Sequence, residues 1–135
     1  GSSRRRPATS GVIVLDTSAL IESLCGMQSE AGRLRSLFVA GEIVRLPAIV
    51  LYEWLRRPRL QEELLAQEQL FPRDQCLPFG ASEAAIAAKL YQNLRVARGR
   101  EVDLAVAATA IAHDAALWTL NENDFRDLPG LRLAG

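Results

Sequence analysis

Four acidic residues stand where a carboxylate could do chemistry. Asp16 directly follows a short run of apolar and β-branched residues, and Asp124 lies in a polar turn segment. Asp103 opens an alanine-rich helical pattern, and Glu53 lies inside an apolar one. If these acids converge in one cleft, they repel one another unless a cation neutralises them. Hard divalent ions prefer oxygen ligands, so this set of acids predicts Mg²⁺ or Mn²⁺ as the cation.

The elements that would carry these acids follow from hydrophobic periodicity. Short apolar runs bounded by turn residues predict strands, and apolar residues at helical spacing predict helices. The strand candidates are 11–15, 42–46, 116–120 and 131–133, with 75–77 a short strand at most. Because strands alternate with helices, we expect a parallel sheet with helices on both faces. Ligands of such sheets bind beyond the carboxyl ends of the strands, which is where Asp16 and Asp124 fall.

The predicted helices fill the segments between those strands. Two helices follow the first strand, with Gly26 and Gly32 as breaks in the helical pattern. Pro47 can open the next helix because the first helical position needs no amide donor. Ser82 is expected to cap a later helix, and Asp103 to begin the last one. The remaining helical ranges are 60–70, 82–96 and 103–114.

Length and charge bound the possible classes of protein. The 135 residues, 49% of them hydrophobic, suit one core and are too few for two ordinary domains. We therefore expect a single domain over 11–135. Residues 1–10 predict a flexible basic arm, and Gly1 with Ser2 is typical of a cloning remnant. The 16 basic residues balance 16 acidic ones, so any nucleic-acid surface must be local.

Cysteine spacing and hydropathy predict the compartment. Cys25 and Cys76 lack the spacing of a disulfide framework or a zinc site, which favours a reducing cytoplasm. No apolar run approaches the roughly 18 residues of a membrane-spanning helix, and the first residues lack the apolar core of a signal peptide. We therefore expect a cytoplasmic protein that does not enter a membrane.

Four short pieces of sequence carry the acids in a particular order. The pieces are 14–20 (VLDTSAL), Glu53 on a helix, 103–110 (DLAVAATA) and 119–125 (TLNENDF). Each alone would occur often by chance, but four at these separations are specific. Together they resemble the signature of the PIN-domain family, in particular its VapC-type ribonuclease toxins, over residues 12–133. The resemblance implies a three-layer αβα fold, a parallel sheet of four to five strands in the order 3-2-1-4-5, and metal-dependent endonucleolytic cleavage of RNA.

The same resemblance implies roles for particular residues. The catalytic quartet would be Asp16, Glu53, Asp103 and Asp124. The ligands of Mg²⁺ or Mn²⁺ among them would be Asp16, Asp103 and Asp124. Glu53 is expected to orient or deprotonate the attacking water. Thr17 and Asn121 are expected as polar supports, and Glu101 as a further acid outside the ligand set.

Partners follow from the resemblance and from surface patterns. A VapC-type toxin implies an RNA substrate, a cognate antitoxin protein and a homodimer. Two arginine clusters could hold RNA phosphates or could simply be surface groups. The arginines selected for RNA binding are Arg56, Arg57, Arg98 and Arg100. Leu51, Leu55 and Leu60 could form an apolar docking surface for the antitoxin.

Plainer interpretations remain open for each residue. Asp16 and Asp103 could be ordinary helix caps. Asp124 could be an ordinary turn residue, and Glu53 could lie on a solvated face. The single histidine, His113, suits a structural position near a helix C-terminus better than a catalytic one.

Three other functions also remain open. One is an RNA-processing PIN nuclease that is not a toxin, and another is a catalytically idle α/β interaction module. A third is phosphoryl transfer through an aspartyl phosphate. Against the third, Ser18 stands where a DxD motif needs its second acid, and the only lysine, Lys89, lies in a helical pattern.

Overall fold

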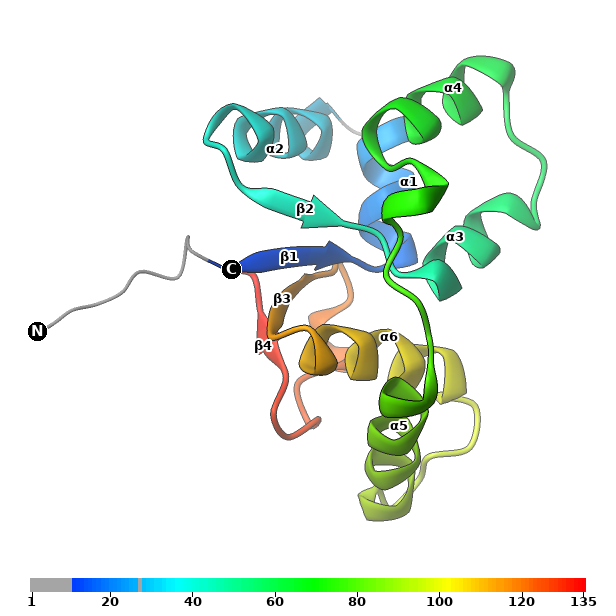
Figure 1. Cartoon of the computed structure of the whole chain (residues 1–135), viewed down its shortest axis with the longest axis vertical. Helices are drawn as coiled ribbons and strands as arrows, with labels where there is room; N and C mark the ends of the chain where they lie inside the picture. The colour runs from blue at the N-terminus through cyan, green and yellow to red at the C-terminus, as the bar shows by residue number, and fades with distance from the viewer. Residues whose placement is uncertain (1–10, 27) are drawn as a thin grey trace, which may run out of the picture.

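A four-stranded parallel sheet forms the centre of the computed structural model, which describes residues 11–26 and 28–135 (Figure 1). The strands are β1 (Val12–Leu15), β2 (Ile43–Arg45), β3 (Ala115–Trp118) and β4 (Arg132–Leu133). Their order across the sheet is β2-β1-β3-β4, with every neighbouring pair parallel. Leu15 at the end of β1 is paired with Trp118 at the end of β3. The residues that follow these two strands are therefore neighbours.

The third predicted strand is reduced to a single pairing. Leu77 forms an isolated parallel bridge with Pro47, just beyond the end of β2. The Leu77 N–H donates to the Leu46 carbonyl over 2.9 Å, and its carbonyl accepts the Ala48 N–H over 2.8 Å. Pro78 follows at once and has no N–H with which to extend a ladder. The predicted order 3-2-1-4-5 is thus confirmed, with its third strand shortened to one bridge.

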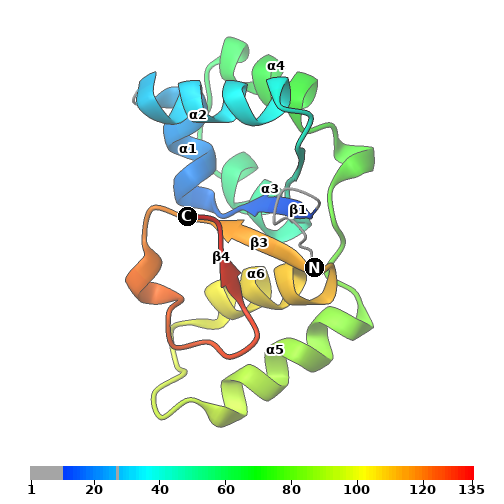
Figure 2. The same ribbon diagram turned by 90° about the vertical axis from the view of Figure 1, so that its left-hand side faces the viewer.

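Helices cover both faces of the sheet. They are α1 (Thr17–Cys25), α2 (Gln28–Val39), α3 (Ala48–Leu55), α4 (Gln61–Leu70), α5 (Ala81–Asn93) and α6 (Glu101–Ala112), with the short 3₁₀ turns η2 (Arg73–Gln75) and η3 (Glu122–Asp124). Figures 1 and 2 show α1, α2 and α4 on one side of the strands and α5 and α6 on the other. Helix α3 contacts both α1 and α6. The predicted three-layer αβα architecture is confirmed.

The predicted helix break at Gly32 and the predicted helix cap at Ser82 are wrong. Gly32 lies inside α2, and the break falls only near Gly26, the C-cap of α1. Ser82 lies inside α5, whose N-cap is Gly80. The Gly80 N–H donates to Glu83 Oε1 over 2.9 Å, so the acid of the first turn reaches back to the cap. The cap therefore comes from Glu83 rather than from a hydroxyl.

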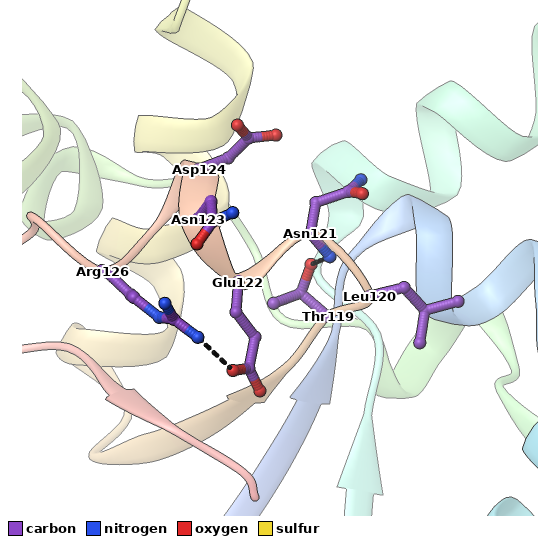
Figure 3. Close-up of a pocket in the computed structure, with 7 residues that line it drawn as sticks. All are labelled: Thr119, Leu120, Asn121, Glu122, Asn123, Asp124 and Arg126. Atoms are coloured by element: carbon purple, nitrogen blue, oxygen red, sulfur yellow. Dashed lines mark hydrogen bonds and ion pairs between the residues drawn. The ribbon is translucent and has the colours of Figure 1, made fainter.

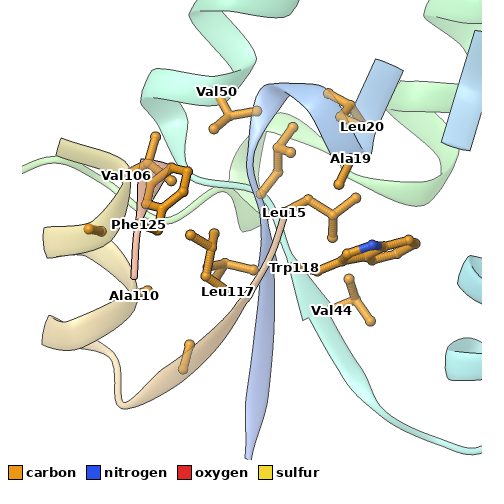
Figure 4. Packing of buried hydrophobic residues seen from close by; sticks show 14 of the residues in the cluster. Leu15, Ala19, Leu20, Val44, Val50, Val106, Ala110, Leu117, Trp118 and Phe125 are labelled. Carbon is orange, nitrogen blue, oxygen red and sulfur yellow. The ribbon is translucent and has the colours of Figure 1, made fainter. Parts of the chain in front are cut away.

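The hydrophobic core fixes the carboxyl ends of β1 and β3. Leu117 faces α6 together with Val106 and Phe125, whereas the next residue, Trp118, faces the α1 layer with Leu20 (Figure 4). All five side chains are buried. Burial of such a side chain contributes roughly 1.5–3 kcal/mol, so the strand ends have little freedom to move.

No helix within residues 11–26 and 28–135 combines the length and the apolar character that a membrane crossing requires. The flexible arm predicted for residues 1–10 lies outside the described part of the chain.

Candidate active site

Asp16 is held by three donors at the junction of β1 and α1. It is the N-cap of α1, and its Oδ1 accepts the Ala19 N–H over 2.9 Å and the Ser18 hydroxyl over 2.7 Å. Its Oδ2 accepts the hydroxyl of Thr119. The Asp16 N–H in turn donates to the Trp118 carbonyl over 3.1 Å. The carboxylate is buried, so its position is fixed while lone pairs remain for a further partner.

Two hydroxyls, Ser18 and Thr119, lock the loop after β3 onto the start of α1. The Leu120 N–H donates to Ser18 Oγ over 3.1 Å, and the Asn121 N–H donates to Thr119 Oγ1 over 3.0 Å. Neither hydroxyl was predicted from the sequence, and Asn121 was expected as a polar support instead. Asn121 contributes its backbone to this network, and no hydrogen bond of its side chain to an acid is found in the described residues. The parallel pairing of β1 with β3 would have identified Thr119, because it follows β3 as Asp16 follows β1.

Glu53 lies on α3 with both carboxylate oxygens engaged. Thr17, the first residue of α1, donates its hydroxyl to Glu53 Oε1 over 2.5 Å. Arg56 Nη2 lies 3.4 Å from Glu53 Oε2, and its guanidinium carbon lies 5.4 Å from the centre of the Tyr52 ring. Thr17 therefore contacts an acid, as a support would, but the acid is Glu53 rather than its neighbour Asp16.

Asp103 is a partly buried acid in the first turn of α6. Helix α6 begins at Glu101, two residues earlier than predicted, so Asp103 lies in its first turn. Nothing in the described ranges 11–26 and 28–135 donates a hydrogen bond to its carboxylate. Burial raises its pKa, and the negative charges of Asp124, Asp16 and Glu53 raise it further. The other three predicted acids therefore lie within electrostatic reach of Asp103, and we call these four the acidic site.

Asp124 ends the turn η3, beyond the carboxyl end of β3. It lines a hollow of about 570 Å³ together with Asn121, Glu122 and Arg126, among others. Figure 3 shows that Asp124 and Glu122 point to opposite sides of the turn, with Glu122 turned toward Arg126. Only one of the two acids of η3 therefore contributes to the acidic site.

Arg100 holds the far end of this turn. Its two terminal nitrogens each donate to one carboxylate oxygen of Asp127 over 2.9 Å, and Nη2 also donates to the Asp124 carbonyl over 2.8 Å. These bonds hold the pKa of Asp127 below its usual range. Because a carboxylate occupies its guanidinium, Arg100 is not available to RNA in the way predicted. Arg57 and Arg98 are exposed, while Arg56 is paired with Glu53.

Glu101 and His113, which the sequence analysis also considered, lie apart from the acidic site. Glu101 lines a hollow with Tyr91 on α5, because two residues along a helix turn the side chain by about 200° from Asp103. Glu101 was expected as a further acid outside the ligand set, and that role stays a prediction, with its side chain lining this other hollow. His113 pairs with the buried Glu83 at 3.2 Å and links α6 to α5, which is a structural position.

The four acids fit a divalent cation by their chemistry. All supply hard oxygen ligands, and Asp103 has three negative charges around it and no hydrogen-bond donor among the residues that the structure describes. Within residues 11–26 and 28–135, no three acidic, histidine or cysteine groups are already arranged as a metal-binding cluster. The donor set is thus suited to Mg²⁺ or Mn²⁺, and the carboxylates stand apart in the structure described.

The order of strands, the flanking helices and the acids at the strand ends define a known class of domain. A profile of the PIN domain family matches residues 13–131, so the chain belongs to that family. Among curated proteins, a stretch of 60 residues is 43% identical to Ribonuclease VapC of Rickettsia bellii and 40% identical to Ribonuclease VapC1 of Rickettsia felis. That stretch is 42% of this chain and spans only 44% of the length of each relative.

Solved structures show the same fold over nearly the whole chain. VapBC2 from Rickettsia felis, bound to a DNA fragment from its promoter, is similar with a TM-score of 0.71 and 21% identity, over 91% of this chain and 97% of the other. DNA-bound VapBC from Salmonella typhimurium gives 0.70 and 19%, over 92% and 97%. FitAcB from Neisseria gonorrhoeae gives 0.68 and 24%, over 90% and 96%. At these identities the likeness extends to the fold alone.

Proposed function

We propose that this protein is a Mg²⁺- or Mn²⁺-dependent endoribonuclease, the VapC-type toxin of a type II toxin–antitoxin pair. The observation that carries the proposal is the acidic site. The charges of Asp16, Glu53 and Asp124 act on the partly buried Asp103 in a PIN fold, and no described residue donates a hydrogen bond to the Asp103 carboxylate. The partial similarity to proteins named Ribonuclease VapC supports the choice of RNA as substrate.

Asp16, Asp103 and Asp124 are the proposed metal ligands. When bound, the ion would neutralise the acids, polarise the scissile phosphate and make water a stronger nucleophile. Asp16 enters this role already oriented by Ala19, Ser18 and Thr119. Asp103 is the ligand whose charge would gain most from the ion, because it is partly buried among other negative charges.

Glu53 is the proposed general base. The hydroxyl of Thr17 fixes one of its oxygens and Arg56 faces the other, so the carboxylate has a defined orientation. A carboxylate held in this way can orient the attacking water and accept its proton, provided the water lies within hydrogen-bonding distance. Arg56 also supplies positive charge at the edge of the acidic site, where a phosphate must approach.

RNA and protein partners are proposed from the exposed surface. Arg57 and Arg98 are exposed and carry no ion pair among the described residues, so they can contact phosphates of the RNA. Leu55 on α3 and Leu60 before α4 are exposed apolar side chains, and we assign them to the antitoxin-binding surface. From the proposed toxin function we also infer that the protein forms a homodimer and acts in the cytoplasm.

Cleavage of a mixed pool of transfer and ribosomal RNA tests the nuclease. Purified protein in Mg²⁺ or Mn²⁺ should yield discrete products, and EDTA or Asp103→Asn should abolish them. Asp114→Asn is the matched control, because Asp114 also belongs to the α6 region but its side chain is 97% exposed and paired with Arg132. If the Asp103→Asn variant cleaves RNA as fast as an active Asp114→Asn variant, the assignment of the acidic site is contradicted.

Growth measurements test the toxin part separately. Induced expression of the wild type in a bacterial host should arrest growth, and expression of the Asp103→Asn variant should not. RNA cleavage in vitro without growth arrest would favour an RNA-processing nuclease instead. Absence of both cleavage and metal binding would favour an idle interaction module.

A further inference from the structure

One guanidinium connects the two segments that carry Asp103 and Asp124. Arg100 is the N-cap residue of α6, three residues before Asp103, and Asp127 lies three residues after Asp124. The Arg100–Asp127 pair is bidentate, with both N–O distances 2.9 Å. Nη2 of Arg100 also donates to the Asp124 carbonyl over 2.8 Å. The arginine therefore binds this segment at the Asp124 backbone and at the Asp127 side chain.

We propose that the Arg100–Asp127 pair is a positioning device that sets Asp124 against Asp103 in the acidic site. This inference rests on the proposed function, because it concerns how the metal ligands are arranged. It replaces the RNA-binding role predicted for Arg100 and gives Asp127 a role that the sequence did not indicate. Neither residue would touch the reacting atoms.

The rest of the turn is anchored from the opposite side. Phe125 and Leu128 are buried in the core with 2% and 4% exposure, and they hold the backbone against α6 and the sheet. The Asp124 N–H donates to the Asn121 carbonyl over 2.9 Å, which closes η3 on itself. None of these contacts ties the turn to the N-terminus of α6, where Asp103 lies. The bonds of Arg100 supply that connection.

A second ion pair in the same turn provides a contrast. Arg126 and Glu122 meet through a single N–O distance of 3.3 Å, with 65% and 41% of their side chains exposed. A single exposed contact of this kind contributes little, whereas a bidentate pair with a third hydrogen bond has defined geometry. Arg126→Gln is therefore a matched control for variants of Arg100 and Asp127.

The test uses two variants that remove the geometry in different ways. Asp127→Asn keeps the size of the side chain but removes the carboxylate, and Arg100→Lys keeps the positive charge but removes the planar fork. Titration with Mn²⁺ in a calorimeter measures metal affinity, and kinetics on a cleaved RNA separate kcat from KM. We expect both variants to lose roughly 10- to 100-fold in Mn²⁺ affinity, with a fall in kcat and little change in KM. Arg126→Gln should match the wild type.

An RNA-binding role for Arg100 makes the opposite prediction. Asp127→Asn would then free the guanidinium, so Mn²⁺ affinity would stay at the wild-type value and KM would stay unchanged or fall. Arg100→Lys would still bind phosphate as a point charge. That pattern would overturn the positioning role while leaving the nuclease intact.

Hydrogen exchange of the metal-free protein tests the positioning role of the Arg100–Asp127 pair without relying on activity. Backbone amides of residues 121–127 should exchange faster in Asp127→Asn and Arg100→Lys than in the wild type or Arg126→Gln. Unchanged exchange would overturn the inference even if the wild type cleaves RNA. If the two variants exchange faster but the wild type neither binds Mn²⁺ nor cleaves RNA, the proposed function is overturned. The Arg100–Asp127 pair would then be a structural connection only.

Discussion

The two sides of the acidic site are built differently. On the β1 side, Asp16 is buried and receives hydrogen bonds from one backbone amide and two hydroxyls. On the α6 side, Asp103 receives none from the described residues, and its pKa is raised first by partial burial and then by the charges of three other acids. Both are aspartates close to the start of a helix, so local sequence does not distinguish them.

Asp16 is thus a ligand already held by hydrogen bonds, and we call its side of the acidic site the prepared side. Asp103 is a ligand without such bonds among the described residues, and we call its side the unsatisfied side. The donors around Asp16 stabilise its charge, so that part of the site is complete without a cation. The charge on Asp103 is destabilised by its surroundings, which is tolerable where a bound cation compensates it. Substitutions on the two sides should therefore have similar effects on cleavage and opposite effects on stability.

The largest expected effect is on catalysis, where the two sides should behave alike. Asp16→Asn and Asp103→Asn should each lower the rate of RNA cleavage by more than about 100-fold, because loss of even outer partners of metal ligands costs 10- to 100-fold. Single-turnover cleavage in Mg²⁺ measures both. Substantial activity in either variant would remove that residue from the metal ligands.

A hydroxyl on the prepared side should also matter. Thr119→Val deletes a donor to Asp16 without changing side-chain volume greatly. We expect cleavage to fall roughly 10- to 100-fold and stability to fall by about 1–3 kcal/mol, because a buried carboxylate loses a partner. Urea unfolding together with cleavage assays measures the two effects. A variant with normal activity would show that Asp16 does not need this donor.

Stability should distinguish the two aspartates. In metal-free buffer at neutral pH, Asp103→Asn should raise the free energy of unfolding by roughly 0.5–2 kcal/mol, since it removes repulsion at a functional site. Asp16→Asn should lower it by about 1–3 kcal/mol, since an amide cannot accept from all three donors. Paired urea titrations measure both shifts, and shifts of the same sign would contradict the comparison.

The pH dependence follows from the direction of the Asp103 shift. Its pKa is higher in the folded protein than the ordinary value of 3.8, so the folded state binds a proton more tightly than the unfolded state does. Asp103 therefore favours folding at low pH, and this contribution is lost as pH rises from 3.8 through the raised pKa. The stability difference between Asp103→Asn and the wild type should grow over that interval and then level off.

The smallest expected effects lie outside the acidic site. Arg57→Gln and Arg98→Gln should each weaken RNA binding modestly and reduce the slope of log affinity against log salt by about one. Filter binding to a non-cleaved RNA, using an Asp103→Asn background, measures this. A salt slope that neither variant changes would move the RNA path away from these arginines.

The sequence predicted the architecture because each buried strand is a short apolar run with a helical pattern after it. The apolar runs 11–15 and 116–120 predicted β1 and β3, although β3 ends at Trp118, and the alternation of elements implied parallel pairing. The third strand was the weakest prediction, because the bridge at Leu77 ends at Pro78. The helix starts at Ala81 and Glu101 were missed, because caps depend on backbone geometry that periodicity does not report.

In the acidic site, the acids could be selected from sequence but their partners could not. The hydroxyls that hold Asp16 come from Ser18 and from Thr119, 103 residues away, and only the register of β1 against β3 brings the latter near. The family resemblance selected Thr17 as a polar support, and α1 turns its hydroxyl toward Glu53. The bonds of Arg100 to Asp127 likewise depend on how the turn folds back.

The central claim is that the unsatisfied side of the acidic site is completed by a divalent cation. The most direct test is the melting temperature of the wild type, Asp103→Asn and Asp114→Asn with increasing Mn²⁺. The wild type and Asp114→Asn should be stabilised, by about 2.7 kcal/mol when Mn²⁺ reaches a hundred times its dissociation constant. Asp103→Asn should melt higher than the wild type without metal and gain little from Mn²⁺. No shift in the wild type, or an equal shift in Asp103→Asn, would contradict the account.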